Sequence, residues 1–153
     1  MPKVLLNLPH RRQGLRADCL PACVAMILDY LDRPIPYPRL LSLLDTRDFG
    51  TPAENILRLE NLGIGIKVTL VHTDVEGLRG RLEAGRPVIT FVNTGDLLYW
   101  SEATDHAFVV VGVEGNVLYI NDPYFDQAPQ RISRTHFELA WLRFDNLCAV
   151  ITV

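Results

Sequence analysis

Hydrophobic and polar positions divide the chain into a first half with helical spacing and a second half with short apolar runs. An almost unbroken apolar segment follows Cys19 and predicts a helix to about Asp32, because two prolines come directly afterwards. Residues 38–44 predict a second helix. The Thr-Pro-Ala-Glu motif at residues 51–54 offers an N-cap, a proline in the first turn and a glutamate three positions after the cap, which predicts a third helix that ends at Gly63.

From residue 64 onwards the apolar runs are short and rich in β-branched residues, which is typical of strands. The predicted strands are residues 64–71, 88–92, 107–113, 117–120 and 148–153, with another short strand at 4–8. Two helices, at 73–85 and 136–143, lie between them. Because the helices come mostly first and the strands mostly later, we expect an α+β fold in a single domain over residues 1–153.

Composition narrows the function classes. The net charge is −3 and the basic residues are scattered, so no nucleic-acid partner is expected. No apolar run reaches the length of a signal peptide or a membrane span, which predicts a cytoplasmic protein with no membrane partner. The 3 cysteines form an odd set without framework spacing, so at least one thiol is expected to be free.

Cys19 is the candidate nucleophile, because it lies at the predicted N-terminus of the first helix. The unpaired N–H groups at a helix N-terminus carry partial positive charge and stabilise a thiolate. A cysteine in an apolar segment also serves as a small core residue, so other groups must support the assignment. A cysteine nucleophile needs a base, a group that orients the base, and donors for the oxyanion.

His106 and Asp122 are the candidates for the base and its orienting group. His106 begins one apolar strand and Asp122 ends the next. A three-residue loop at 114–116 places Phe108 opposite Asp122 and makes His106 and Asp122 diagonal neighbours on one face, whereas a two-residue loop places them on opposite faces. We expect the three-residue loop. The simpler interpretations are a histidine bonded to backbone and an Asp-Pro turn.

Gln13 completes the set. It lies in a polar loop six positions before Cys19. Its amide can donate to an oxyanion beside the Cys19 backbone N–H, although a glutamine in a loop is also an ordinary solvated residue.

These residues, in this order, resemble the bacteriocin-processing peptidase family of papain-like cysteine peptidases. In that family Gln, Asp-Cys, His and Asp-Pro follow one another at similar spacings, here as Gln13, Asp18-Cys19, His106 and Asp122-Pro123. The resemblance covers nearly the whole chain. It implies that Cys19 is the nucleophile, His106 the base and acid, Asp122 the orienting group and Gln13 the oxyanion donor.

The resemblance also implies a fold and a substrate class. The expected fold is papain-like, with an N-terminal helical part that carries the nucleophile at a helix N-terminus. That part packs on a C-terminal antiparallel β-sheet that carries the histidine and the aspartate. The expected substrate is a peptide or protein, cut through a thioester after small residues such as Gly-Gly. Family members often form the N-terminal domain of an ATP-driven exporter. For this chain we expect no cofactor and no metal.

The sequence departs from the family pattern in two ways. The residue after the nucleophile is usually glycine, and here Leu20-Pro21 follows Cys19, which is expected to alter the cleft. The sequence also has no membrane segment and no glycine-rich loop ending in Gly-Lys-Ser or Gly-Lys-Thr, so we expect a standalone domain without a transporter.

Three other interpretations remain. Cys19 and Cys23 share one helix face and would form a metal site with Cys148 and a histidine. The chain would alternatively be an inactive peptide-binding module of the same fold, or use the same machinery for isopeptide cleavage or amide transfer. The loop from Gly95 to Asp105 carries aromatic residues that either wall the substrate cleft or belong to the core.

Overall fold

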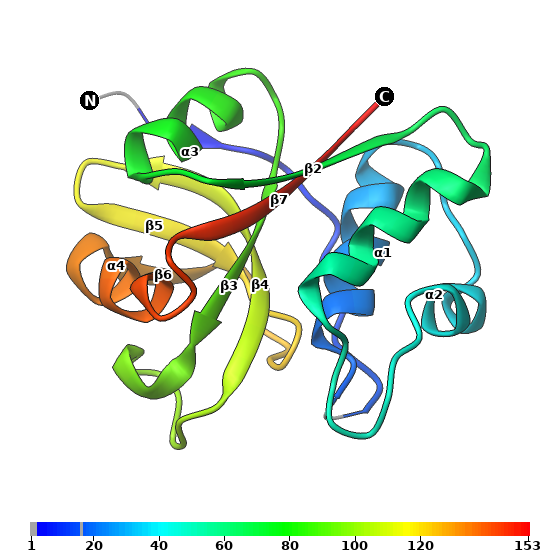
Figure 1. The fold of residues 1–153 in the computed structure, drawn as a ribbon. Helices are drawn as coiled ribbons and strands as arrows, with labels where there is room; N and C mark the ends of the chain where they lie inside the picture. Colours follow the sequence, from blue (N-terminus) through cyan, green and yellow to red (C-terminus); the bar gives the residue numbers. More distant parts are fainter. Residues whose placement is uncertain (1–2, 16) are drawn as a thin grey trace.

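The computed structural model describes residues 3–15 and 17–153. A helical part, formed by α1 (Cys19–Tyr30), α2 (Tyr37–Leu43) and the 3-10 helix η1 (Ala53–Leu62), lies beside a curved sheet (Figure 1). Two further helices, α3 (Val75–Glu83) and α4 (Arg134–Leu142), pack on the sheet itself. The chain therefore has the helical and sheet parts that the sequence predicts.

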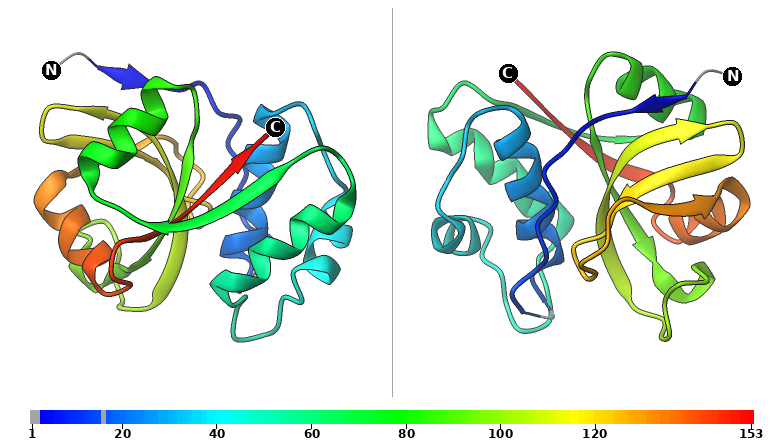
Figure 2. Two further views of the ribbon diagram at one scale, coloured as in Figure 1. Left: turned by 45° about the horizontal axis from the view of Figure 1, so that its top comes forward. Right: turned by 180° about the vertical axis from the view of Figure 1, so that it is seen from behind.

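The sheet is antiparallel throughout and has the strand order β2-β7-β3-β4-β5-β6, with β1 paired to β4. Its strands are β1 (Val4–Leu5), β2 (Lys67–His72), β3 (Val88–Asn93), β4 (Asp105–Glu114), β5 (Val117–Asn121), β6 (Gln130–Ser133) and β7 (Leu147–Thr152). A second 3-10 helix, η2 (Thr94–Asp96), follows β3. The segment that leads from β1 to α1 runs down between the sheet and the helical part (Figure 2).

Two hydrophobic clusters hold the fold together, one on each face of the sheet. The first joins α1, α2 and η1 to alternate residues of β4, namely Ala107, Val109 and Val111. The second joins α3 and α4 to the intervening residues Phe108 and Val110. Because side chains alternate across a strand, β4 serves both clusters and fixes the helical part against the sheet.

The β4–β5 connection differs from the expected three-residue loop. Glu114 pairs with Val117, so only Gly115 and Asn116 form the turn. A β-bulge between Val110 and Gly112 then shifts the register by one residue, and Val109 pairs with Asn121. This is the register that a three-residue loop would have produced. The predicted turn is therefore wrong, but the predicted juxtaposition of β4 and β5 is reached through the bulge.

The third predicted helix also differs in kind. It is a 3-10 helix that begins after Pro52, and it ends as predicted at Gly63, which has a left-handed φ of 68°. The Thr51 hydroxyl lies 2.7 Å from the hydroxyl of Thr46 and does not cap the helix. Strand β6 was not predicted, because its four residues include only one large apolar side chain. Within the described residues, no helix is long and apolar enough to cross a bilayer.

Candidate active site

Cys19 is the first residue of α1, where the sequence places it. The side chain of the preceding Asp18 accepts a hydrogen bond from the Leu15 N–H at 3.2 Å and, within the described contacts, does not cap the helix. Pro21 has no N–H and needs no partner in this first turn. The thiol of Cys19 is partly exposed, whereas α1 is buried from Leu20 to Leu28. The helix thus presents a thiol at its positive end to the surface.

His106 and Asp122 meet at the ends of β4 and β5. The Nε2 atom of His106 lies 2.7 Å from Oδ1 of Asp122, and both side chains are buried. Cys19 and His106 line the same two cavities, and the interaction with Cys19 contributes to the raised pKa of His106. Because Nε2 is bonded to Asp122, Nδ1 is the nitrogen that serves Cys19. The structure therefore brings three of the four predicted site residues into one continuous chain of contacts.

The electrostatics favour a charged histidine. Burial works against the imidazolium form, but hydrogen bonds and charge interactions with Asp122 and Cys19 outweigh it and raise the pKa of His106 to about 9. Burial also works against the Asp122 carboxylate, yet hydrogen bonds from His106, the Tyr124 N–H and Tyr99 hold its pKa below the usual value. At neutral pH the two groups form an imidazolium–carboxylate pair.

Two aromatic residues in the loop before β4 also contact Asp122. The Tyr99 hydroxyl donates to Oδ2 at 2.7 Å, and the Trp100 Nε1–H donates to the same oxygen at 3.0 Å. The sequence predicts that the aromatic residues of this loop belong either to the cleft wall or to the core, and it does not predict their contact with Asp122. No local sequence signal marks it, because the contact spans more than twenty residues and depends on how the loop folds back.

Gln13 lies next to the segment that carries Asp122, and its side chain bonds to its own loop. Its backbone N–H donates to the Pro123 carbonyl at 2.7 Å, which ties the loop before α1 to the residue after Asp122. Its side-chain Nε2 donates to the Leu15 carbonyl at 2.8 Å, and the side chain is buried. The structure thus anchors Gln13 beside the Asp122 segment, with its amide turned toward its own loop.

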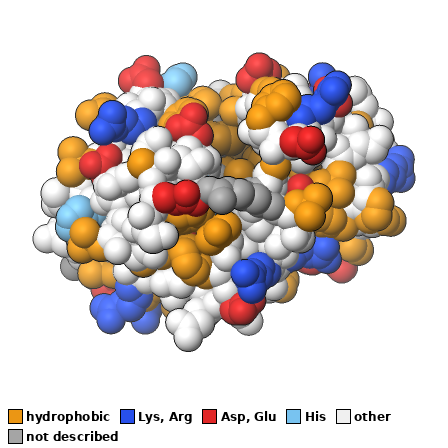
Figure 3. Space-filling model, turned by 90° about the horizontal axis from the view of Figure 1, so that it is seen from below, with side chains coloured by type: hydrophobic (Ala, Val, Ile, Leu, Met, Phe, Trp, Pro, Cys, Tyr) orange, Lys and Arg blue, Asp and Glu red, His pale blue; other side chains and the backbone are white. Residues whose placement is uncertain are grey.

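Cys19 and His106 lie between two cavities that form one cleft. We call the first, of about 290 Å3, the apolar arm; Leu20, Ala53, Phe91 and Phe144 are among the residues that line it. The second, of about 230 Å3, is the polar arm; its lining includes Ala17, Asp48, Trp100, Thr104 and Tyr124. Seen from below, the molecule is hollowed near its centre and hydrophobic side chains line the hollow (Figure 3).

Phe49 lines both arms of the cleft and is 85% exposed. It occupies the tip of a turn in which Arg47 and Gly50 exchange two backbone hydrogen bonds of 3.0 Å. Gly50 adopts a φ of 116°, which a residue with a side chain rarely adopts. Leu20 is 1% exposed and packs in the core while it lines the apolar arm. The Leu20 side chain, which follows the nucleophile, therefore forms part of the wall of the apolar arm.

The other two cysteines are core residues. Cys23 is fully buried, its thiol donates to the Ala107 carbonyl at 3.5 Å, and burial raises its pKa well above the usual value. Cys148 belongs to the cluster on the other face of the sheet, and burial raises its pKa to about 11. Because the three cysteines occupy the cleft and two separate cores, they do not form the metal site considered above. No group of three potential ligands that could hold a metal occurs among the described residues.

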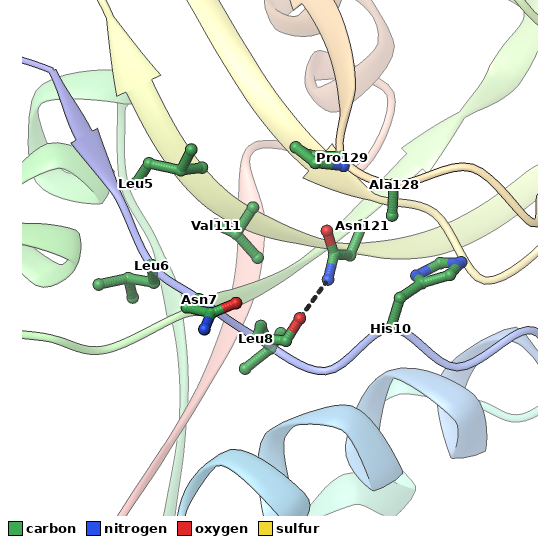
Figure 4. Close-up of a pocket in the computed structure, with 9 residues that line it drawn as sticks. All are labelled: Leu5, Leu6, Asn7, Leu8, His10, Val111, Asn121, Ala128 and Pro129. Carbon is green, nitrogen blue, oxygen red and sulfur yellow. Dashed lines mark hydrogen bonds between the residues drawn. The ribbon is translucent and has the colours of Figure 1, made fainter.

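A further groove, of about 370 Å3, lies between β1 and the β5–β6 connection (Figure 4). Leu5, Val111 and Pro129 are among its lining residues. The buried Asn121 also lines the groove, and its Nδ2 donates to the Leu8 carbonyl at 3.4 Å. None of the predicted site residues lines this groove.

The sequence profile described as "Peptidase C39 family" matches residues 7–148. The chain belongs to the peptidase C39 family. This match confirms the resemblance noted in the sequence and assigns the chain to a family of cysteine peptidases. Comparison with curated protein sequences found no match.

Solved structures of C39 peptidases share the fold. A C39-like peptidase from Bacillus anthracis superposes with a TM-score of 0.84 at 18% identity, over 100% of this chain and 98% of that chain. A double glycine motif protease from an AMS/PCAT transporter, solved with its leader peptide, gives 0.75 at 21% identity over 96% and 92%. The peptidase domain of Streptococcus ComA, a bifunctional ABC transporter, gives 0.76 at 25% identity over 94% and 96%. The papain-like α+β fold is thereby confirmed.

Proposed function

We propose that this C39 family member is a cysteine peptidase that hydrolyses a peptide bond through a thioester on Cys19. The observation that carries the proposal is the contact chain from Cys19 through His106 to Asp122, with its 2.7 Å bond, at the junction of two cleft arms. A thiol that contacts a charged histidine, itself held by a buried carboxylate, is the arrangement that cysteine nucleophiles require. Residues 1–153 are proposed to act as one peptidase domain.

Before the substrate reacts, the Cys19 proton passes to Nδ1 of His106, which gives a thiolate beside the charged histidine described above. The thiolate attacks the carbonyl carbon of the scissile bond and forms a tetrahedral oxyanion. The C–N bond breaks as His106 gives its proton to the leaving amine, which leaves a thioester on Cys19. Water then attacks the thioester while His106 accepts its proton, and the acid product leaves as Cys19 is regenerated. Asp122 keeps the ring oriented and favours its charged form throughout.

The oxyanion is assigned to the backbone N–H of Cys19 and to the amide of Gln13. A helix N-terminus supplies the first donor, because N–H groups in the first turn have no partner within the helix. In this structure Nε2 of Gln13 donates to the Leu15 carbonyl, so the assignment requires the side chain to turn toward the oxyanion when substrate binds. Its backbone bond to Pro123 supports this role, since it fixes Gln13 next to the segment that carries Asp122.

Labelling with a thiol-directed peptidase inhibitor tests the nucleophile. We expect a single adduct on Cys19 and loss of that adduct in His106→Gln. The buried Cys23 and Cys148 serve as internal controls, because both belong to hydrophobic cores. An adduct at either control cysteine in the folded protein, or equal labelling without His106, would refute the assignment.

The substrate is proposed to be a peptide with small residues, such as Gly-Gly, before the cut. Related proteins support this preference: one solved neighbour is a double glycine motif protease in complex with its leader peptide. In this chain Phe49 lines both cleft arms together with Cys19, so its side chain is available to contact the residues of a bound peptide. A screen should compare peptides that have Gly-Gly before the cut with peptides that have Ala-Ala or Leu-Leu there.

Phe49→Ala is the matched variant for this screen, because the side chain is exposed and its loss leaves no core cavity. We expect the variant to hydrolyse the larger peptides relatively better, with a Gly-Gly to Leu-Leu ratio of kcat/KM that falls by about tenfold, the effect of roughly 1.4 kcal/mol. Leu98→Ala, also highly exposed but outside the cleft, should leave the ratio unchanged. An unchanged ratio in Phe49→Ala would show that another group sets the preference.

A further inference from the structure

The carboxylate of Asp122 is held at both oxygens. Oδ1 accepts from His106 at 2.7 Å and from the Tyr124 N–H at 3.0 Å. Oδ2 accepts from Tyr99 at 2.7 Å and from Trp100 at 3.0 Å. The Tyr124 bond is the local Asx turn that any Asp-Pro segment can make. The two bonds to Oδ2 come from a different loop, so the turn itself does not require them.

That loop comprises residues 97–105, and hydrogen bonds from Thr94 hold its two ends together. The Thr94 N–H donates to the Thr104 carbonyl at 2.9 Å, and its hydroxyl donates to the Glu102 carbonyl at 2.8 Å. The same hydroxyl accepts from the Thr104 N–H at 3.0 Å, and Thr94 is 1% exposed. Leu97 anchors the start of the loop in the core. These contacts fix the conformation of the loop, and in this conformation Tyr99 and Trp100 contact Asp122.

We propose that Tyr99 and Trp100 are positioning residues, which hold the carboxylate of Asp122 in the orientation that supports the His106 imidazolium. A carboxylate with one anchored oxygen can rotate about its Cβ–Cγ bond, whereas one anchored at both oxygens cannot do so without losing hydrogen bonds. Bonds from neutral donors also stabilise the buried anion and keep it ionised. The inference rests on the proposed function, since it assigns these residues a part in forming the thiolate–imidazolium pair.

Trp100 has a second effect. Its ring lies edge-on to the His106 ring, with centroids 4.7 Å apart, and packs on Tyr124 at 4.5 Å. The indole therefore covers the His106–Asp122 hydrogen bond and keeps water from competing for it. Because Trp100 also lines the polar arm of the cleft, its replacement changes substrate contacts as well. Tyr99 lines neither arm, so it gives the cleaner test.

The test is Tyr99→Phe, which removes one hydroxyl and keeps the ring that packs on Phe125 at 5.3 Å. We expect kcat to fall about tenfold with KM unchanged, as for the loss of one hydrogen bond to a charged group. The rate of Cys19 alkylation by iodoacetamide should also be measured against pH. The alkaline limb of this profile, where His106 loses its proton, is expected to move to lower pH, because weaker support of the imidazolium lowers the pKa of His106. A purely structural role would not move this limb.

Tyr30→Phe is the matched control, because its hydroxyl donates to the Gly85 carbonyl at 2.8 Å away from the site. It should leave kcat, KM and the alkylation profile unchanged. If Tyr99→Phe does not fold, Trp100→Phe is assayed by the same alkylation profile. An unchanged profile and kcat in a folded Tyr99→Phe overturns the inference. The alkylation readout needs no substrate, so a wild-type protein that cleaves no peptide refutes the proposed function without deciding the role of Tyr99.

Discussion

At the scale of single residues, the site depends on how a buried charge is stabilised. Asp122 is fully buried, and burial of a carboxylate without partners costs several kcal/mol. Four donors from three segments of the chain offset this cost: the His106 ring, the Tyr124 N–H, and the side chains of Tyr99 and Trp100. The same bonds fix the negative charge beside His106, where it favours the imidazolium.

Asp122→Asn tests the contribution of that charge. The amide oxygen can still accept from His106, so the ring keeps its orientation, but the charge that raises the pKa of His106 is lost. We expect the alkaline limb of the pH profile of kcat/KM to move from about pH 9 to lower pH, and kcat/KM to fall about tenfold for each pKa unit lost. Asp126→Asn, which affects only an exposed ion pair with Arg12, should leave the profile unchanged.

The raised pKa of His106 also links stability to pH. Its pKa is higher in the folded protein, at about 9, than the ordinary value of 6.5, so the folded state binds the proton more tightly. This stabilisation is fully present below about pH 6.5 and is lost as the pH rises through 9. Urea unfolding at a series of pH values should show the free energy of unfolding falling over this range. His106→Gln should lack that part of the slope, and an equal slope in the variant would contradict the assignment.

At the scale of elements, the bulge in β4 sets the geometry of the site. It restores the register that brings His106 to Asp122, and it places Gly112 directly under β1. A Cβ atom at Gly112 would lie 2.5 Å from the Val4 carbonyl oxygen and 2.9 Å from the Leu5 side chain. The close approach of β1 therefore requires glycine at this position.

Gly112→Ala should destabilise the protein by about 1–3 kcal/mol, because the added methyl displaces β1. Gly80→Ala is the matched control: its Cβ would meet nothing within 4 Å, and alanine in α3 should stabilise by roughly 0.5–1 kcal/mol. Chemical denaturation of both variants measures the effect. A Gly112→Ala protein as stable as the wild type would show that β1 does not pack as closely as the structure indicates.

The sequence predicted the elements that carry strong local signals, and it missed those that depend on distant contacts. Helix α1, the strand that carries His106, the strand that precedes Asp122, and helix α3 all follow from nearby residues. The bulge in β4 could not be predicted, since no local motif marks it and it lies where Gly112 packs closely against the distant strand β1. The contacts of Tyr99 and Trp100 with Asp122 depend on the closure of a long loop, for which no periodic pattern exists.

At the scale of the whole molecule, the site belongs to neither part alone. Cys19 comes from the helical part, whereas His106 and Asp122 come from the sheet. The first hydrophobic cluster joins the two parts through α1 and β4 and thereby sets the contact between the thiol and the imidazole. The cleft opens along the same junction, so a bound peptide would contact both parts.

The most direct test of this account is to trap the acyl-enzyme. A peptide p-nitrophenyl ester that ends in Gly-Gly would be mixed with the protein, quenched in acid and analysed by mass spectrometry of proteolytic fragments. We expect the fragment that contains Cys19 to gain the mass of the peptide acyl group, and we expect Cys19→Ala neither to form the adduct nor to cleave Gly-Gly peptides. Peptide cleavage that persists in Cys19→Ala would contradict this expectation.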